Sequence, residues 1–281
     1  MACNFSCTDF TFPLLSHRNV LKLISMLGIG TVDIGFLQDR SHIQPSRAAA
    51  DPLGEGKKLR KDLEREGLAA ADVFLQSATD FSSLALNQVR EEARKKARED
   101  FLCTLQFAEG CGSNHVTCLP GVFFPEDTGD TSLERARSEL AWRVEQAAAH
   151  GIILGIEAHR GSIADTPARA KALVESVPGL TLTLDYSHFI RSGFSQAEIT
   201  PLLAYARHFH ARGASPQMMQ TPLKESTIDF IQVVKDMKAA GYRDVITLEY
   251  VYEDWEDNFR VDTVSETILL KQLIESAWGN L

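Results

Sequence analysis

Short apolar runs alternate with longer amphipathic stretches along the whole chain. Eight of the apolar runs have the length and composition of strands that are covered on both faces. They are Cys3–Phe10, Thr31–Phe36, Ala71–Gln76, His115–Leu119, Ile152–Glu157, Leu180–Asp185, His208–Arg212 and Val245–Glu249. The pattern therefore predicts a regular succession of strand–helix units.

Capping signals indicate where helices begin between these strands. Thr131 and Glu134 have the spacing of a capping box, which predicts a helix that runs to Gly151. Thr166 followed by Pro167 predicts a second helix start, because proline is favoured at the first helical position.

The stretches after the second and third predicted strands differ from each other. Residues 82–109 read as one long helical stretch, and residues 38–56 have the Pro, Gly and Ser content of a loop. Eight β/α units in a chain of 281 residues fit one (β/α)₈ TIM barrel, a single domain over residues 1–281. A doubly wound open sheet alternates in the same way, but neither of its phosphate-binding fingerprints, G-x-G-x-x-G after an early strand or G-x-x-x-x-G-K, occurs.

Composition and charge narrow the class of function. A net charge of −9 disfavours binding to nucleic acid, which depends on clustered Lys and Arg. No apolar stretch is long enough for a membrane span, and the first residues lack the basic flank of a secretory signal. Five cysteines without paired spacing favour reduced thiols, so we expect a cytoplasmic protein.

Four of the predicted strands end in a metal-ligating side chain. These residues are Glu157, Asp185, His210 and Glu249. If the strands are neighbours in a parallel barrel, the four side chains converge at one mouth, where their oxygen and nitrogen atoms suit a divalent metal.

Taken singly, each of these residues has a simpler explanation. A carboxylate after a strand is often the cap of the next helix, and His208 or His210 could be a hydrogen-bonded core histidine. Four such strand ends in succession are harder to explain in this way, because burying uncompensated carboxylates together is costly. His210 is nearer than His208 to the end of its strand, so we expect His210 to be the ligand and His208 to lie deeper.

The second half of the chain resembles the xylose isomerase-like superfamily of sugar isomerases and epimerases, which includes endonuclease IV. The segments that carry the resemblance are 155–159, 184–189, 208–212 and 246–249. The first half is similar only in its β/α rhythm, with residues 28–35 and with Asn87 and Arg90.

The resemblance implies one divalent ion, with Mn²⁺ the first expectation and Mg²⁺, Co²⁺ or Zn²⁺ as alternatives, held by the four residues at the strand ends. It implies that Glu157 and Glu249 exchange a proton with the substrate carbon through an enediolate. It also implies that His188 and Arg212 hold substrate oxygens, and we add His159 as a third substrate contact. A metal ion supplies a Lewis acid for such chemistry, and the carboxylates supply the acid and the base.

Other activities on the same scaffold remain open. Xylose isomerase has Glu-Pro-Lys-Pro where this chain has Glu157 to Arg160, so proton transfer is preferred over a hydride shift. A dehydratase of the inosose or dehydroshikimate type would use the same metal and enolate. An endonuclease IV-like nuclease is disfavoured because the histidines of its three-zinc site are missing, and a non-catalytic sugar-binding barrel because all four ligands are present.

We expect a small ketose, polyol or keto-acid substrate from carbohydrate metabolism, with no nucleic-acid or membrane partner. Similar enzymes are often homodimers or homotetramers, and the sequence does not choose between these states. The loop that contains Arg40, together with residues 253–260, could cover the mouth or could be ordinary solvated loops. Arg160 and Arg191 could attract an anionic substrate or pair with nearby acids.

Overall fold

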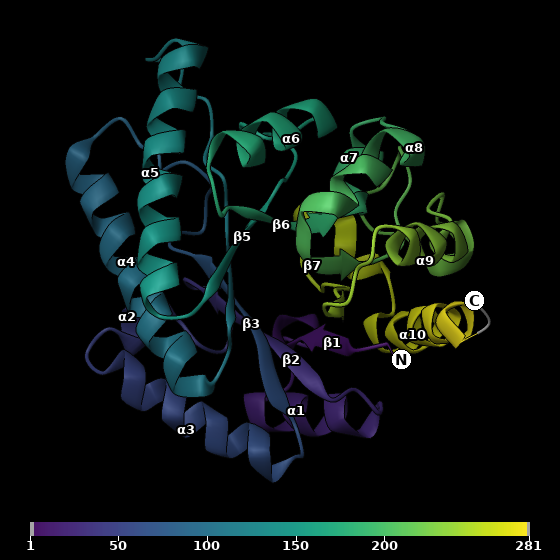
Figure 1. Cartoon of the computed structure of the whole chain (residues 1–281). Helices are drawn as coiled ribbons and strands as arrows, with labels where there is room; N and C mark the ends of the chain where they lie inside the picture. The colour runs from purple at the N-terminus through teal and green to yellow at the C-terminus, as the bar shows by residue number, and fades with distance from the viewer. Residues whose placement is uncertain (1–2, 280–281) are drawn as a thin grey trace.

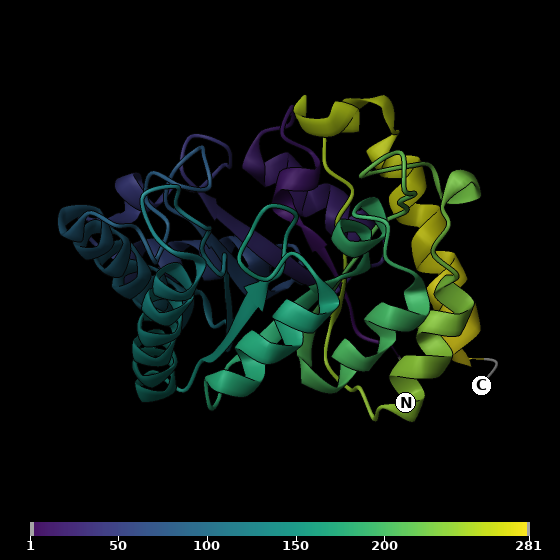
Figure 2. The same cartoon turned by 90° about the horizontal axis from the view of Figure 1, so that it is seen from above.

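A closed barrel of parallel strands forms the centre of the protein (Figures 1 and 2). The computed structural model describes residues 3–279. Each strand pairs with its sequence neighbours, and β8 returns to pair with β1. The strands are β1 (Phe5–Thr8), β2 (Thr31–Leu37), β3 (Ala69–Gln76), β4 (His115–Cys118), β5 (Ile153–Glu157), β6 (Thr181–Asp185), β7 (Ala206–Ala211) and β8 (Ile246–Leu248). The predicted TIM barrel and its eight strands are confirmed, with ends that differ by a few residues.

Helices surround the barrel on its outer side (Figure 1). They are α1 (His17–Met26), α2 (Pro45–Ala48), α3 (Pro52–Arg65), α4 (Glu91–Cys111), α5 (Gly129–Ala149), α6 (Pro167–Ser176), α7 (Tyr186–Arg191), α8 (Gln196–Ile199), α9 (Phe230–Ala239) and α10 (Thr263–Gly279). Short 3₁₀ helices join them: η1 (Asp9–Thr11), η2 (Thr200–Tyr205), η3 (Leu223–Glu225) and η4 (Trp255–Arg260). None of the helices within residues 3–279 is both long and apolar enough to span a membrane.

The main hydrophobic core lies between the strands and the helices rather than inside the barrel. On β2, Val32, Ile34 and Phe36 are buried, and the ring of Phe36 stacks on Phe107 of α4 with centroids 4.7 Å apart. Asp33 alternates with them, so it points to the opposite face of the strand, into the barrel. The alternation therefore puts apolar side chains against the helices and leaves polar side chains inside.

Two of the predicted helix starts are wrong by several residues. The helix expected from residue 82 begins only at Glu91. The side chain of Asn87 donates hydrogen bonds to the carbonyls of Val122 and Ser132, which holds that segment in a loop. The helix α5 begins before the expected capping box, because the side chain of Thr128 caps it by accepting from the Thr131 N–H.

Other local predictions fare differently. Thr166 accepts from the Arg169 N–H and Pro167 opens α6, as expected. The predicted loop at residues 38–56 is only partly a loop, because α2 lies inside it and α3 begins at Pro52.

Candidate metal centre and active site

The four strand-end residues meet at the carboxyl-terminal mouth of the barrel. Glu157 and Asp185 are the last residues of β5 and β6, His210 lies near the end of β7, and Glu249 directly follows β8. All four side chains are buried, with no more than 5% of any residue exposed. The four strand ends thus lie at one mouth, and their role as ligands stays a prediction.

The atoms of these residues form two overlapping groups. His210 Nδ1 lies 2.8 Å from Glu157 Oε1 and 3.2 Å from Glu249 Oε2. These three residues offer ligand atoms within 4.8 Å of one another, and so do Glu157, Asp185 and His188. Among the described residues no single group unites all four predicted ligands, because Asp185 Oδ2 is turned toward Arg212, whose Nη2 lies at 2.8 Å.

Charge is strongly organised around these carboxylates. Burial opposes ionisation of Glu157, but the nearby His188 and the hydrogen-bonded His210 outweigh burial and hold the pKa of Glu157 well below its usual value. Burial and the nearby charge of Glu157 raise the pKa of Glu249, although His210 and Arg212 oppose this rise. The pKa values of the two glutamates are thus shifted in opposite directions.

The cationic groups respond to the same cluster. Burial disfavours charge on His210, yet Glu249, Asp33 and Glu157 together raise its pKa well above the ordinary value. Burial also opposes the charge of Arg212, but Asp185 and Glu249 hold its pKa above its usual range. In this arrangement a proton on His210 supplies positive charge that a bound cation could supply instead.

The residues present fit a divalent ion. Glu249 Oε2 is buried and has no hydrogen-bond partner within the described part of the chain. Carboxylate oxygens and one imidazole nitrogen, taken from three or four strand ends, are a donor set that Mn²⁺, Mg²⁺, Co²⁺ and Zn²⁺ accept. The Oε2 atom of Glu249 has only ion-pair contacts, with His210 Nδ1 at 3.2 Å and Arg212 Nη2 at 3.6 Å, and an ion would give it a direct partner.

A cavity of about 210 Å³ opens above these residues. His159, His188 and Arg212 line it beside Glu157 and Glu249. His188 lies in α7 rather than in the loop expected there, because Asp185 caps a short helix directly after β6. Its Nε2 is 3.7 Å from Glu157 Oε2 and 3.3 Å from Arg212 Nη2.

His159 is held as a neutral ring. Burial, followed by the neighbouring His188, lowers the pKa of His159 to about 4. Its Nδ1 lies 3.0 Å from the carbonyl of Arg160, and its ring packs on Phe81 with centroids 4.5 Å apart. The Nε2 atom is buried without a partner in the described chain, so it is available to a bound molecule.

Two segments cover the outer part of the cavity. Arg40 forms an ion pair with Glu253 and donates to Gln76 Oε1 at 3.0 Å. Trp255 also lines the cavity and lies over His188, with ring centroids 6.3 Å apart. Both segments that the sequence left ambiguous therefore border the site, and η4 lies at the mouth end of the barrel (Figure 2).

Arg160 and Arg191 do not point at the cavity as free cations. Both pair with Glu256 of η4, at 2.5 Å and 2.8 Å. Of the two interpretations of these arginines, the structure favours pairing with a nearby acid.

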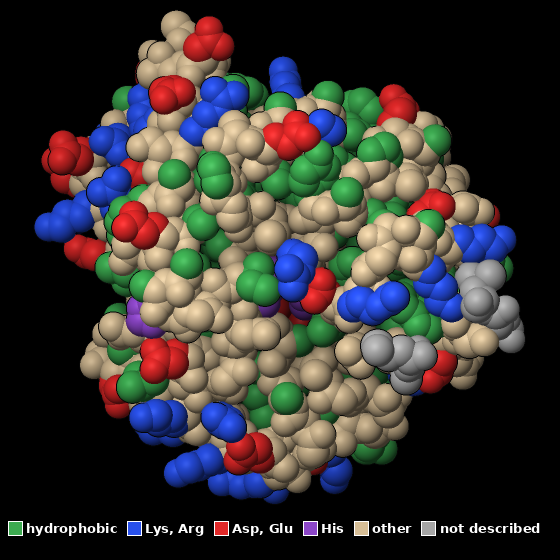
Figure 3. All heavy atoms as spheres, viewed as in Figure 1, with side chains coloured by type: hydrophobic (Ala, Val, Ile, Leu, Met, Phe, Trp, Pro, Cys, Tyr) green, Lys and Arg blue, Asp and Glu red, His purple; other side chains and the backbone are tan. Residues whose placement is uncertain are grey.

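On the face seen in Figure 3, Lys and Arg side chains are interspersed with Asp and Glu, without one broad basic patch.

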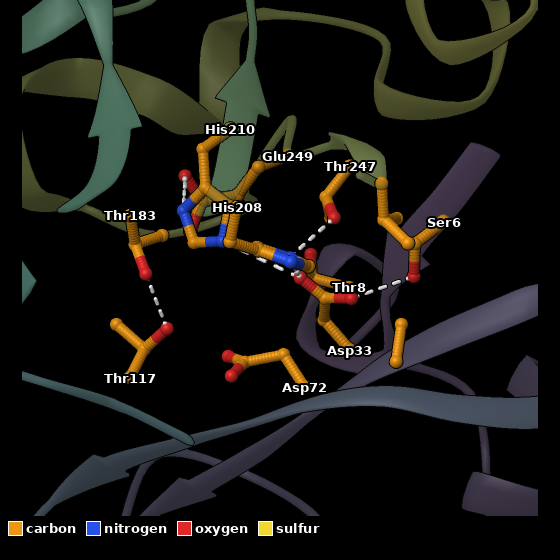
Figure 4. Close-up of polar contacts among 12 residues, drawn as sticks. Ser6, Thr8, Asp33, Asp72, Thr117, Thr183, His208, His210, Thr247 and Glu249 are labelled. Atoms are coloured by element: carbon orange, nitrogen blue, oxygen red, sulfur yellow. Dashed lines mark hydrogen bonds and ion pairs between the residues drawn. The ribbon is translucent and has the colours of Figure 1, made fainter. Parts of the chain in front are cut away.

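Apart from His208, which we expected to lie deep in the barrel, the sequence analysis did not predict a second polar layer below the mouth. Asp33, Asp72, His115 and His208 lie inside the barrel, each with at most 4% of its surface exposed. Figure 4 shows Asp33, Asp72 and His208 together. His208 lies deeper than His210, as expected, and its Nε2 is 2.6 Å from Asp33 Oδ2. The available signal was an acidic residue in the middle of each of two apolar strands, β2 and β3.

The fold and this site define a (β/α)₈ barrel with a candidate metal centre at its carboxyl-terminal mouth. The family model described as xylose isomerase-like TIM barrel matches residues 21–268, and the chain belongs to this family. The expected resemblance is therefore confirmed.

Individual relatives are more distant. The chain is 23% identical over 231 residues to a putative L-ribulose-5-phosphate 3-epimerase, SgbU, of Escherichia coli K12, covering 76% of this chain and 78% of that protein. D-psicose 3-epimerase from Clostridium cellulolyticum H10 has a similar structure, with a TM-score of 0.77, 12% identity and 99% of each chain covered. The probable 3-DHS dehydratase AsbF from Bacillus anthracis has a TM-score of 0.72 at 15% identity, covering 95% of this chain and 98% of that one. The relation to sugar epimerases indicates an enzyme.

Proposed function

We propose that the chain is a divalent-metal-dependent isomerase or epimerase of a small sugar or keto-acid. The observation that carries the proposal is the convergence of Glu157, His210 and Glu249, with Asp185 beside them, next to a cavity that the two glutamates line. The similarity to a putative sugar-phosphate epimerase and to D-psicose 3-epimerase supports a sugar as substrate.

Glu157 and Glu249 are the proposed acid and base. Their pKa values are pushed apart, as expected of two carboxyl groups with different roles in proton transfer. Glu157 would accept a proton from the substrate carbon beside the carbonyl, and Glu249 would return one on the other face. Such acid–base catalysis is worth about 10²–10⁴ in rate.

Glu157, Asp185, His210 and Glu249 would hold the ion. When bound, it would act as a Lewis acid and a template for the substrate oxygens. Before the ion binds, Asp185 is engaged by Arg212 and His210 by Glu157, so these contacts would have to yield. His210 would lose the proton on Nδ1 to become a ligand.

Three further side chains are proposed to position the substrate. Arg212 is fixed by Ser187 Oγ, which accepts from its Nε at 2.9 Å, and could donate to a developing oxyanion. His188 lies between Arg212 and Glu157, where it could hold a substrate oxygen. His159 could bond a hydroxyl through its free Nε2, because its ring is neutral near pH 7.

A dehydratase is the second candidate, since the structural resemblance extends to AsbF as well as to the epimerase. It would use the same proton abstraction but would expel a hydroxyl as water. The fold does not separate the two reactions, because the difference lies in which acid reaches the leaving group.

The test is to incubate metal-loaded protein with a panel of ketoses, their 5-phosphates and cyclic keto-polyols in D₂O. If the protein is an isomerase or epimerase, the sugar product gains a deuteron on carbon and loses no water. Net loss of water identified by mass spectrometry would replace the proposal with the dehydratase. A protein that binds metal but exchanges no proton with any substrate of the panel would contradict both.

A further inference from the structure

Asp33 lies directly behind the proposed metal ligand His210. The nitrogen of His210 that faces away from the ligand carboxylates, Nε2, is 3.4 Å from Asp33 Oδ2 (Figure 4). This Nε2 atom is buried and has no hydrogen-bond partner within residues 3–279. One ring thus joins the mouth of the barrel, through Nδ1, to the deeper layer, through Nε2.

Asp33 is itself held rigidly from two other strands. Its Oδ1 accepts a hydrogen bond from Ser6 Oγ of β1 at 2.6 Å, and its Oδ2 lies 2.6 Å from His208 Nε2 of β7. Thr247 of β8 places its hydroxyl 2.8 Å from the same His208 nitrogen. No part of Asp33 is exposed to solvent.

The chemistry of a metal-bound imidazole gives this contact a role. An imidazole that binds a metal through Nδ1 carries its remaining proton on Nε2, and that proton is usually donated to a carboxylate or carbonyl. Asp33 Oδ2 is the acceptor in reach of His210. We propose that Asp33 is a positioning residue that fixes the tautomer and the ring orientation of His210 and so tightens the binding of the metal ion.

The inference rests on the metal ligands of the proposed function, but not on the identity of the substrate. It gives Asp33 a second role beside its contact with His208, since the same Oδ2 atom lies within reach of both imidazoles. The competing explanation is that Asp33, Asp72, His208 and His210 form a second metal site, because they too offer atoms within 4.8 Å of one another.

Asp72 supplies a matched control. It is equally buried, lies on the adjacent strand β3, and also pairs with a histidine, since its Oδ1 is 2.6 Å from His115 Nδ1. Among the ion pairs of the described residues, Asp72 has one with His115 and none with His210. An Asp-to-Asn change at each position removes the same charge from the same layer.

The experiment measures the affinity of the full chain for Mn²⁺ and Co²⁺ alone, by competition with a chelating dye, in wild type, Asp33→Asn and Asp72→Asn. We expect Asp33→Asn to weaken affinity about 10–100-fold, as loss of such a partner typically does, and Asp72→Asn to leave it nearly unchanged. The visible spectrum of bound Co²⁺ should also change in Asp33→Asn alone, because the ring of His210 is less well fixed.

Other outcomes would overturn the inference. Equal weakening in both variants, or none in Asp33→Asn, would show that Asp33 has no special relation to His210. Two bound ions, one of them lost in Asp72→Asn, would make the deep layer a second metal site. If Asp33→Asn does not fold, Ser6→Ala is measured instead, because it removes only the hydrogen bond that Ser6 donates to Asp33. Weaker metal binding in Ser6→Ala would support the inference, and unchanged binding would contradict it. A wild type that binds no ion would refute the proposed function as well.

Discussion

The barrel interior contains two polar layers that differ in how their groups are satisfied. At the mouth, three acids and a histidine crowd together under a cavity, and Glu249 Oε2 has no hydrogen-bond partner in the described chain. Below them, side-chain pairs close on one another, such as Thr117 with Thr183 at 2.6 Å and Asp72 with His115 at 2.6 Å. The mouth borders a cavity that can take a ligand, whereas the deep layer is enclosed and largely paired, although Asp72 Oδ2 and His115 Nε2 also lack hydrogen-bond partners within residues 3–279.

The comparison also separates the layer proposed to carry out the reaction from the layer that stabilises the barrel beneath it. A buried polar network is stabilising only when its members are satisfied, and an incompletely satisfied cluster signals strain, an unseen ion or a reaction site. Here the cluster that borders the cavity lies where TIM-barrel enzymes carry their active sites, and the more fully paired layer lies beneath it. Variants in the two layers should therefore change different observables.

The largest effect is expected from the two glutamates of the mouth. Glu157→Gln and Glu249→Gln should each lower turnover by about 10²–10⁴, because each removes a group proposed to move a proton. Steady-state kinetics on the substrate found by the panel gives the measurement. Thr117→Val, in the deep layer, is the control and should leave turnover unchanged; activity retained in both glutamine variants would refute the mechanism.

Metal removal should have the next largest effect. Elemental analysis should find about one divalent ion per chain, lost in Asp185→Ala. Chelation should lower the free energy of unfolding by ~2.7 kcal/mol relative to protein kept at 100 times the dissociation constant of the ion. Thermal unfolding with and without chelator gives the measurement, and the chelator should not move the melting temperature of Asp185→Ala.

In the deep layer, the pair Thr117–Thr183 should contribute to stability alone. Thr117→Val leaves the Thr183 hydroxyl buried without its partner, which costs about 1–3 kcal/mol in the free energy of unfolding. Replacing both threonines by valine should recover part of that loss, because no orphaned hydroxyl remains. Denaturant unfolding of the two single variants and the double variant completes the cycle. If the double variant loses more free energy of unfolding than the two single variants together, the two threonines do not act as a simple pair.

A smaller effect is expected from His115 as pH falls. Burial lowers the pKa of His115 from its ordinary 6.5, although Asp72 opposes the shift. The unfolded chain then binds more protons than the folded one below pH 6.5, so this residue contributes a loss of stability as the pH falls through that value. Unfolding measured from about pH 8 to pH 5 should show a shallower decline in His115→Gln than in wild type. Parallel curves would contradict the assignment.

The smallest effect should come from the segment over the mouth. Glu256→Gln removes the charge that Arg160 and Arg191 share, but these pairs are partly exposed and so are worth only ~0.2–1 kcal/mol each. We expect a modest rise in KM without a change in kcat, because η4 borders the cavity but contributes no proposed catalytic group. Lys58→Gln, at a surface ion pair on α3, is the control. A large fall in kcat would mean that η4 takes part in catalysis.

The positions of the polar residues at the strand ends could be predicted from the sequence because of a simple geometric rule. Strand length and apolar composition predicted where β5 to β8 end, and parallel strands of a barrel bring those ends to one mouth. What the pattern could not give is the state of each side chain. Asp185 faces Arg212, and His188 lies on a helix, because of contacts that depend on the folded mouth.

The pairings within the deep layer could not be predicted from the sequence, for a different reason. Asp33 and His208 are 175 residues apart along the chain, and no local spacing relates them. The helix expected from residue 82 failed similarly, since the bonds of Asn87 to Val122 and Ser132 override the local propensity. Periodicity predicts elements, whereas polar pairs across the barrel depend on closure.

Closure of the barrel has a consequence for the position of Glu249. The strand β8 has only three residues, and it closes the sheet on β1 through the pairs Phe5 with Ile246, Ser6 with Thr247 and Cys7 with Leu248. Glu249 follows this seam directly, whereas Glu157 and His210 come from β5 and β7. An ion bound to all three would tie β8 to β5 and β7, but it would not bridge the seam itself, because no proposed ligand lies on β1. The pairing of three residues between β8 and β1 therefore has to hold Glu249 in place before any ion binds.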